Sequence, residues 1–163
     1  MTSPAAPSTC HDALDPAAVV PALVLDTNVV LDWLVFRHPS CARLADHVGA
    51  GRIRWIASRA MRDELAHVLQ RGVVDAWAPD LATLWATWEQ HARPAESIAL
   101  AGDATRLRCT DSDDQKFIDL ALAHRARWLL SRDRAVLKVA RRARLLGLEV
   151  LTPDAWDSHL TAD

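Results

Sequence analysis

The sequence is poor in cysteine, and the three that it has do not form a pattern. Cys10, Cys41 and Cys109 are odd in number, widely spaced and without a CxxC pair. Neither a disulfide framework nor a thiolate zinc site is therefore indicated. With 163 residues, half of them hydrophobic, the chain can bury one core without a covalent staple. This composition favours a reducing, cytoplasmic setting.

Long hydrophobic runs are also missing. No stretch approaches the roughly twenty apolar residues that a membrane helix requires, and the proline-rich start lacks a basic segment followed by an apolar one. We expect a soluble, intracellular protein without a membrane partner. Residues 1–21 are predicted to be a flexible tail, because their prolines and small residues cannot support an apolar face, and residues 22–163 to be one domain.

Net charge is small, but the charges are unevenly distributed. The formal charge of −2 says little about partners, because opposite charges in different regions cancel. Residues 125–144 contain eight basic residues against one acid, Asp133, which is a local balance of +7. This segment could contact a polyanion.

Short apolar segments alternate with segments of helical periodicity. The run 22–25 is continuously apolar, which is typical of a strand buried on both faces. Further strands are predicted at 54–57, 128–130 and 148–151, with a less legible one at 97–100. Helices are predicted at 28–36, 40–49, from Ser58 through Leu69, 73–91 with a break near Pro79, 113–125, and 133–146 ending at Gly147, with a last turn from Pro153. The alternation predicts a three-layer α/β/α domain with a central, mainly parallel sheet of four to five strands.

Four acidic residues occupy the places where the predicted strands end or their helices begin. Asp26 and Asp133 follow strands, Glu64 lies in the first turns of a helix, and Asp114 begins another. Because parallel strands end at one edge of a sheet, we expect these carboxylates to converge. A divalent cation would remove their mutual repulsion, and oxygen ligands without cysteine or paired histidine favour Mg²⁺ or Mn²⁺ over zinc.

Each acid also has a simpler explanation. Asp114 is equally well explained as a helix cap, Glu64 alone is more typical of an exposed helix face, and Asp113 is more typical of a solvated loop. Asp26 is harder to explain in this way, since burying an unpartnered carboxylate after an apolar strand costs several kcal/mol.

Four ordered segments carry a family resemblance. They are Leu-Asp-Thr-Asn-Val at 25–29, Arg-Asp-Glu-Leu at 62–65, Asp-Ser-Asp-Asp-Gln-Lys-Phe at 111–117 and Leu-Leu-Ser-Arg-Asp at 129–133. Over about Ala22 to Trp156 the chain resembles PIN domains, specifically the toxin components of type II toxin–antitoxin modules, the VapC-like ribonucleases. The resemblance implies a PIN-like α/β/α fold.

The resemblance also implies a site and an activity. It makes Asp26, Glu64, Asp114 and Asp133 the catalytic and metal-binding acids, with Asn28 and Ser131 as polar supports. Relatives often carry a third consecutive acid where this chain has Gln115, so Asp113 is an alternative to Asp114. Family members cleave RNA, are frequently dimers and often pair with a small antitoxin. We therefore expect an Mg²⁺- or Mn²⁺-dependent endoribonuclease that leaves a 5′-phosphate and a 3′-hydroxyl, forms a homodimer and binds a cognate antitoxin.

Within that mechanism Asp26 is expected to be the central ligand, and Glu64 a ligand or the base that orients water. Asp114 and Asp133 are expected to be further ligands, partly through intervening water. A basic stripe at helical spacing beside Asp133 either tracks the RNA backbone or is a solvated helix face; its members are Arg134, Lys138, Arg141 and Arg142. Trp85 and Trp88 could stack on RNA bases, although packing explains them better.

Two other functions fit parts of the sequence. One is a non-catalytic module on the same fold that binds RNA or an antitoxin, which the retention of all four acids disfavours. The other is a phosphotransfer domain with an acceptor aspartate at the end of a strand, a function that requires a lysine after the last strands. The two lysines of the chain, Lys116 and Lys138, lie on predicted helices instead.

Overall fold

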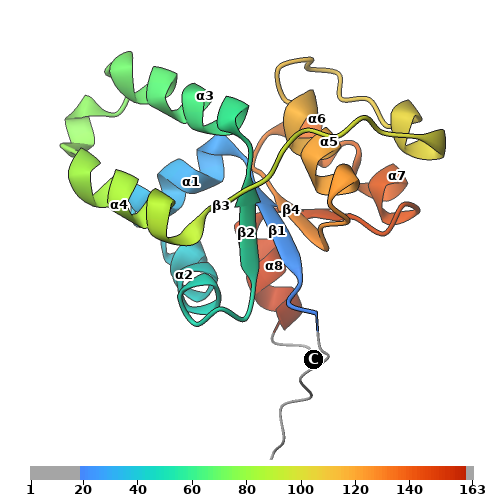
Figure 1. Ribbon diagram of the computed structural model, residues 1–163. Coiled ribbons are helices and arrows are strands. Elements are labelled where there is room, and N and C mark those ends of the chain that lie inside the picture. The colour runs from blue at the N-terminus through green and yellow to red at the C-terminus, as the bar shows by residue number, and fades with distance from the viewer. Residues whose placement is uncertain (1–18, 161–163) are drawn as a thin grey trace, which may run out of the picture.

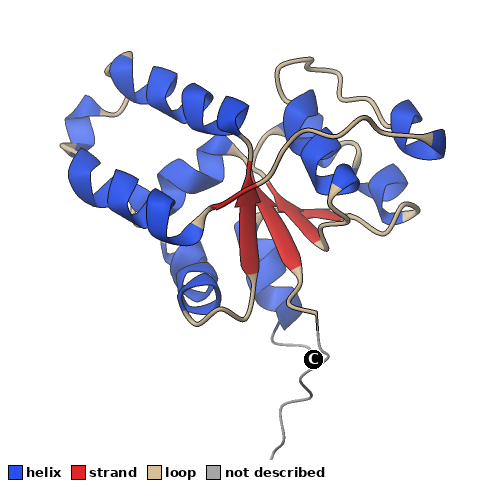
Figure 2. Cartoon of the chain, viewed as in Figure 1, coloured by secondary structure: helices blue, strands red, loops and turns tan. Residues whose placement is uncertain are grey.

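A computed structural model describes residues 19–160 and contains one parallel sheet at its centre (Figure 2). The strands lie in the order β3-β2-β1-β4-β5, and every neighbouring pair is parallel. Their bounds are β1 Ala22–Leu25, β2 Arg54–Ala57, β3 Arg93–Pro94, β4 Trp128–Leu130 and β5 Glu149–Leu151. The expected fold class, a parallel sheet of four to five strands between helical layers, is confirmed.

Helices flank the sheet (Figure 1). In Figure 1, α1 to α4 lie to the left of the strands and α5 to α7 to the right, with α8 below and behind them. The α-helices are α1 Thr27–Leu34, α2 Ala42–Gly49, α3 Arg59–Gln70, α4 Leu81–His91, α5 Gln115–Ala123, α6 Arg134–Leu137, α7 Ala140–Arg144 and α8 Pro153–Leu160, and short 3₁₀ turns cover Pro39–Cys41, Asp75–Trp77 and Gly102–Arg106. None of the helices within 19–160 has both the length and the apolar character needed to cross a bilayer.

The core forms around β1, as its continuous apolar run predicts. All four residues of β1 are buried, and Leu23 and Val24 are fully buried. Tryptophans fill the space between sheet and helices: Trp55 of β2 meets Trp88 of α4 edge-on at 4.9 Å between ring centroids. Trp88 therefore packs in the core, as the sequence favours, and burial of these large rings supplies much of the hydrophobic stabilisation.

Two predicted elements differ from those observed. The strand expected at 97–100 is wrong: the edge strand is Arg93–Pro94, which pairs with β2 and is exposed, so it carries no apolar signature. The continuous helix expected at 133–146 divides into α6 and α7. The division occurs where the Val139 N–H donates to the carbonyl of Val136, three residues back, while both valines stay buried.

Other expectations at the ends of elements hold in part. The region 73–91 is broken as expected near Pro79, and only Leu81–His91 is α-helical. Pro153 begins an eight-residue helix rather than a single turn. The two cysteines in the described part of the chain, Cys41 and Cys109, are free. The tail expected at 1–21 lies outside the described residues except for its last three.

The order of the strands creates a reversal point beside β1. The chain moves from β1 outward through β2 and β3, and later returns on the other side of β1 through β4 and β5. In open parallel sheets the loops that leave the carboxyl ends of the strands diverge at such a reversal, which is where ligands bind. The segments after β1 and after β4 therefore form the floor of a candidate site.

Candidate active site

Asp26 lies at the reversal point, directly after β1. Its backbone N–H donates to the carbonyl of Leu130 at the end of β4 at 3.0 Å, which extends the pairing of the two strands by one residue. Its side chain is buried although it is a carboxylate, with the residue 3% exposed. Burial raises the pKa of Asp26, and the charge of Glu64 adds to this, whereas hydrogen bonds from Ser131 and Asn28 oppose it.

Two neighbours restrict how the Asp26 carboxylate can turn. The hydroxyl of Ser131 donates to Oδ2 of Asp26, and Asn28 Nδ2 donates to the same oxygen at 3.0 Å. Asn28 Oδ1 also accepts from the backbone N–H of Arg132 at 3.1 Å. Both expected supports therefore contact Asp26, and they tie the segment after β1 to the segment after β4.

Asp133 has a structural role beside its candidate chemical one. It is the N-cap of α6, and its Oδ1 accepts from the backbone N–H of Ala135 at 2.6 Å and of Val136 at 3.4 Å. The Ser131 hydroxyl accepts in turn from the backbone N–H of Asp133 at 2.9 Å. Ser131 thus links Asp26 and Asp133 through one side chain.

Asp114 approaches the same place from α5, of which it is the N-cap. Its own burial raises the pKa of Asp114 to about 6, with further contributions from the nearby charges of Asp26 and Asp133. Asp113, the alternative suggested by the family pattern, is exposed, and its backbone N–H donates to Asp111 Oδ1 at 2.9 Å. The structure therefore brings Asp114, rather than Asp113, to Asp26 and Asp133.

Glu64 reaches the site from α3, but both of its oxygens are engaged. Thr27 Oγ1 donates to Oε1 at 2.7 Å, and Lys116 of α5 forms an ion pair with Oε2. Ser58 caps α3 as predicted, with its hydroxyl accepting from the N–H of Met61, so the first turns of the helix point toward the carboxyl edge of the sheet. Thr27 and Lys116 lie within the family-like segments, but no spacing in the sequence indicates that they contact Glu64.

The four acids converge without forming a finished ligand set. Among residues 19–160 no three acidic, histidine or cysteine side chains lie close enough together to hold a metal ion as they stand. Glu64 is paired with Lys116, and Oδ1 of Asp133 accepts the hydrogen bonds that cap α6. The donor chemistry, carboxylates alone, nevertheless suits a hard divalent cation.

Arg132 supports the site from behind. Its guanidinium forms an ion pair with Asp32 of α1, contacts Asp154 of α8 at 2.9 Å, and donates to the hydroxyl of Ser40 at 2.8 Å. Because Arg132 lies between Ser131 and Asp133, these contacts anchor the segment that carries both. Nothing in the sequence indicated these long-range partners.

The basic stripe is exposed, but it does not lie on one helix. Arg134 belongs to α6, Arg141 and Arg142 to α7, and Lys138 to the junction between them. Arg142 also donates to the backbone carbonyl of Arg108 at 3.1 Å. Trp85 is only half-buried, and the guanidinium of Arg62 lies 4.6 Å from its ring centroid.

The raised pKa of Asp114 predicts a pH-dependent gain in stability when its charge is removed. The pKa of Asp114 is 3.8 in the unfolded chain and about 6 in the fold. As the pH rises from about 4 to about 6, Asp114 ionises in the unfolded chain before it ionises in the fold, so the free energy of unfolding of the wild type falls. In cation-free protein, Asp114→Asn should therefore equal the wild type in free energy of unfolding at pH 4. At pH 7 it should exceed the wild type by about 1 kcal/mol, a value reduced for solvent screening of a partly exposed group.

Urea unfolding at several pH values in EDTA measures this difference. Asp113→Asn, one residue away and exposed, is the matched control and should show no such trend with pH. A constant difference between Asp114→Asn and the wild type across pH 4–7 would mean that the fold does not raise the pKa of Asp114.

Comparison with known proteins is consistent with this geometry. A family model described as PIN domain matches residues 22–135. No curated protein matches the chain. Among solved structures, a chain of the crystal structure of VapBC2 from Rickettsia felis bound to a DNA fragment from their promoter is similar in fold, with a TM-score of 0.55 and 13% sequence identity. The match covers 79% of this chain and 96% of that one.

Proposed function

Because this chain belongs to the PIN domain family, we propose that it is a metal-dependent endoribonuclease, the toxin of a toxin–antitoxin pair. PIN domains are in general nucleases. The observation that carries the proposal is the convergence of Asp26, Asp114 and Asp133 from three separate segments: the pKa of Asp114 is raised first by its burial and then by the nearby charges of Asp26 and Asp133. A divalent cation bound among these carboxylates would relieve both costs.

In this proposal the chain holds Mg²⁺ or Mn²⁺ with Asp26, Asp114 and Asp133, while Glu64 either joins them or orients the attacking water. A bound cation supplies Lewis acidity that neutralises charge on the phosphoryl oxygens during hydrolysis. Ser131 and Asn28 keep Asp26 Oδ2 fixed, so that its other oxygen, Oδ1, lies outside that pair of hydrogen bonds.

Cleavage of a labelled RNA by the purified protein tests the activity. We expect cuts in Mg²⁺ or Mn²⁺ that leave a 5′-phosphate and a 3′-hydroxyl, and no cutting in EDTA. Cleavage that persists in EDTA, or that leaves a 2′,3′-cyclic phosphate, would contradict the mechanism. RNA binding without any cleavage would favour a non-catalytic module on the same fold.

Replacing Asp133 should separate its two roles. Asp133→Asn keeps an oxygen that can cap α6 and loses the charge, so we expect it to retain stability while RNA cleavage falls by about 10²-fold or more. Asp133→Ala loses both, so it should also lower the free energy of unfolding by about 1 kcal/mol. Equal stability of the two variants, measured by urea unfolding, would contradict the capping role.

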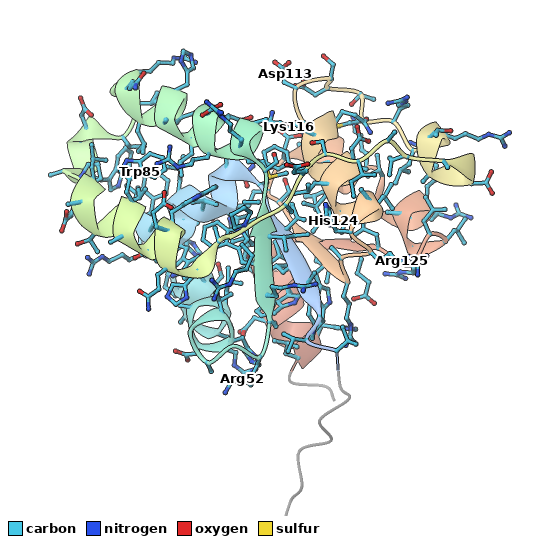
Figure 3. All side chains as sticks on the ribbon, viewed as in Figure 1. Arg52, Trp85, Asp113, Lys116, His124 and Arg125 are labelled. Carbon is cyan, nitrogen blue, oxygen red and sulfur yellow. The ribbon has the colours of Figure 1, made fainter. Side chains whose placement is uncertain are left out.

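We propose that the basic stripe binds the RNA backbone. Arg134→Gln and Arg141→Gln should each weaken RNA binding and lower the slope of log K against log salt by about 0.7, the value expected for one lost phosphate contact on a single strand. Arg52, which precedes β2 at the amino ends of the strands and lies far from the acids (Figure 3), gives a matched control in Arg52→Gln. An unchanged slope in both stripe variants would leave these residues as a solvated face.

The remaining parts of the proposal concern the setting. A cognate antitoxin and a homodimer follow from the family resemblance, and the likeness in fold to a VapBC2 chain supports the first. A cytoplasmic location follows from the unpatterned cysteines. Light scattering of the purified chain, alone and with the product of the neighbouring open reading frame, measures both assemblies.

A further inference from the structure

Lys116 is a cation built into an otherwise acidic site. It lies in the first turn of α5, at the gap between α3 and α5 in Figure 3, and its ammonium forms an ion pair with Glu64 Oε2. The same ammonium donates to the backbone carbonyl of Asp113. The two paired side chains are only 25% and 30% exposed, so their contact is stronger than a fully exposed surface ion pair.

Each oxygen of Glu64 already has one partner. Lys116 engages Oε2 and the hydroxyl of Thr27 engages Oε1 at 2.7 Å. A divalent cation that binds Glu64 would therefore lie next to one of these two partners and share its oxygen. Because Lys116 is itself positive, it is also repelled by an incoming cation, whereas the neutral hydroxyl of Thr27 is not. Lys116 is therefore the partner that competes with the cation for Glu64.

The side chain of Lys116 can move without disturbing the core. The ammonium lies 4.9 Å from the ring centroid of Phe117, which is itself fully buried, and the lysine is half-buried at the rim of the site. A flexible four-carbon stem carries the charge and can reach other acceptors nearby. An RNA phosphate that approaches the acids is the strongest acceptor to arrive there.

We propose that Lys116 is the internal counter-ion of the carboxylate site: it occupies Glu64 until a divalent cation binds, and the released ammonium then binds a phosphate oxygen of the RNA. This inference rests on the proposed function, because it requires that the site bind both a cation and RNA. It assigns to Lys116 a role that links the two, so that the phosphate contact becomes available only when the site is loaded.

Mn²⁺ binding to the chain without RNA tests the first half. Lys116→Gln removes the competing cation, so we expect it to bind Mn²⁺ about fivefold more tightly than the wild type in a calorimetric titration. Arg52→Gln removes one positive charge from an exposed residue that lies far from the acids, at the amino ends of the strands, so it is the matched control and should leave Mn²⁺ affinity unchanged. Equal affinities for Lys116→Gln and the wild type would overturn the proposal.

The same titration separates this inference from the function on which it rests. A wild type that binds no Mn²⁺ would overturn the metal site and the counter-ion role together. A wild type that binds Mn²⁺ as tightly as Lys116→Gln would overturn the counter-ion role alone and leave the nuclease proposal standing.

RNA binding as a function of salt tests the second half. Ca²⁺ replaces Mg²⁺ so that an oxygen site is filled with looser geometry while cleavage is slowed. With a short single-stranded RNA, we expect the slope of log K against log salt to be about 0.7 smaller for Lys116→Gln than for the wild type, and to be restored in Lys116→Arg. In EDTA the slopes of all three should coincide. Coinciding slopes in Ca²⁺ would rule out the phosphate contact.

Discussion

Replacing Asp26 by asparagine is expected to lower the rate of RNA cleavage by about 10³-fold or more, the largest effect of any single change in this site. Asp26 is the most buried of the four acids of the site, 3% exposed between the ends of β1 and β4. Asparagine keeps the shape and an oxygen that Ser131 can contact, but it removes the charge that holds a cation. The rate is measured on labelled RNA in Mg²⁺ and in Mn²⁺.

The same variant should fold at least as well as the wild type. Burial and the charge of Glu64 raise the pKa of Asp26, so its charged form is unfavourable in the cation-free fold. The neutral side chain should therefore show no loss of unfolding free energy at pH 7 in EDTA. Asp46→Asn, on the exposed side of α2, is a control with the same change of charge. Cleavage by Asp26→Asn at the wild-type rate would place the activity elsewhere or in a contaminant.

Removing the guanidinium of Arg132 should have the largest effect on stability. Arg132 is the common partner of Asp32, Asp154 and Ser40, and the Asp32 side chain is only 13% exposed. Arg132→Ala would leave the charge of Asp32 unpaired, which we expect to cost about 2 kcal/mol of unfolding free energy. This is less than the ~3–5 kcal/mol of fully buried pairs, because the arginine side chain is 33% exposed.

A second substitution identifies the cause of that loss. In Arg132→Ala with Asp32→Asn the unpaired charge is gone, so part of the lost stability should return in urea unfolding. RNA cleavage should be slower than in the wild type in both variants, since the guanidinium contacts that anchor the segment from Ser131 to Asp133 are missing from each. A double variant no more stable than Arg132→Ala would show that packing, rather than the ion pair, accounts for the effect.

The sequence predicts the part of the site at the ends of β1 and β4 well, because an apolar run that indicates a buried strand is followed there by acidic residues. The apolar run before Asp26 is long enough to indicate a buried strand, and the same is true before Ser131 and Asp133. Parallel strands that end together then bring the acids together without further information. Asn28 lies two residues from Asp26, so their contact follows from local geometry. Ser131 contacts Asp26 across 105 positions, because the parallel strands β1 and β4 end side by side.

What the sequence does not predict depends on contacts between distant segments. The pairing of Lys116 with Glu64 joins residues 52 positions apart, and two partners of Arg132, Asp32 and Ser40, lie still farther away along the chain. In the sequence these two residues are marked only by their positions: Lys116 follows an acidic segment, and Arg132 lies between two residues of the site. The edge strand at Arg93–Pro94 also has no pattern in the sequence, because a two-residue exposed strand is defined by its backbone pairing with β2 rather than by its side chains.

The division between α6 and α7 shows the limit of periodicity. Val136, Val139 and Ala143 recur at spacings of three and four and are all buried, which is the pattern of one amphipathic helix. One tightened turn at Val139 preserves that burial while ending the regular hydrogen-bonding pattern. The capping function of Asp133 could be predicted from its place before a helix. That the same residue both caps a helix and lies among the acids is seen only in the folded structure.

A crystal structure of the chain soaked in Mn²⁺, with anomalous difference density calculated at the manganese edge, tests most directly whether the acids bind one cation together. We predict density between Asp26, Asp114 and Asp133, with Glu64 turned away from Lys116 and toward the ion. Manganese bound only at other surfaces, or acids that keep their cation-free arrangement at saturating Mn²⁺, would contradict it.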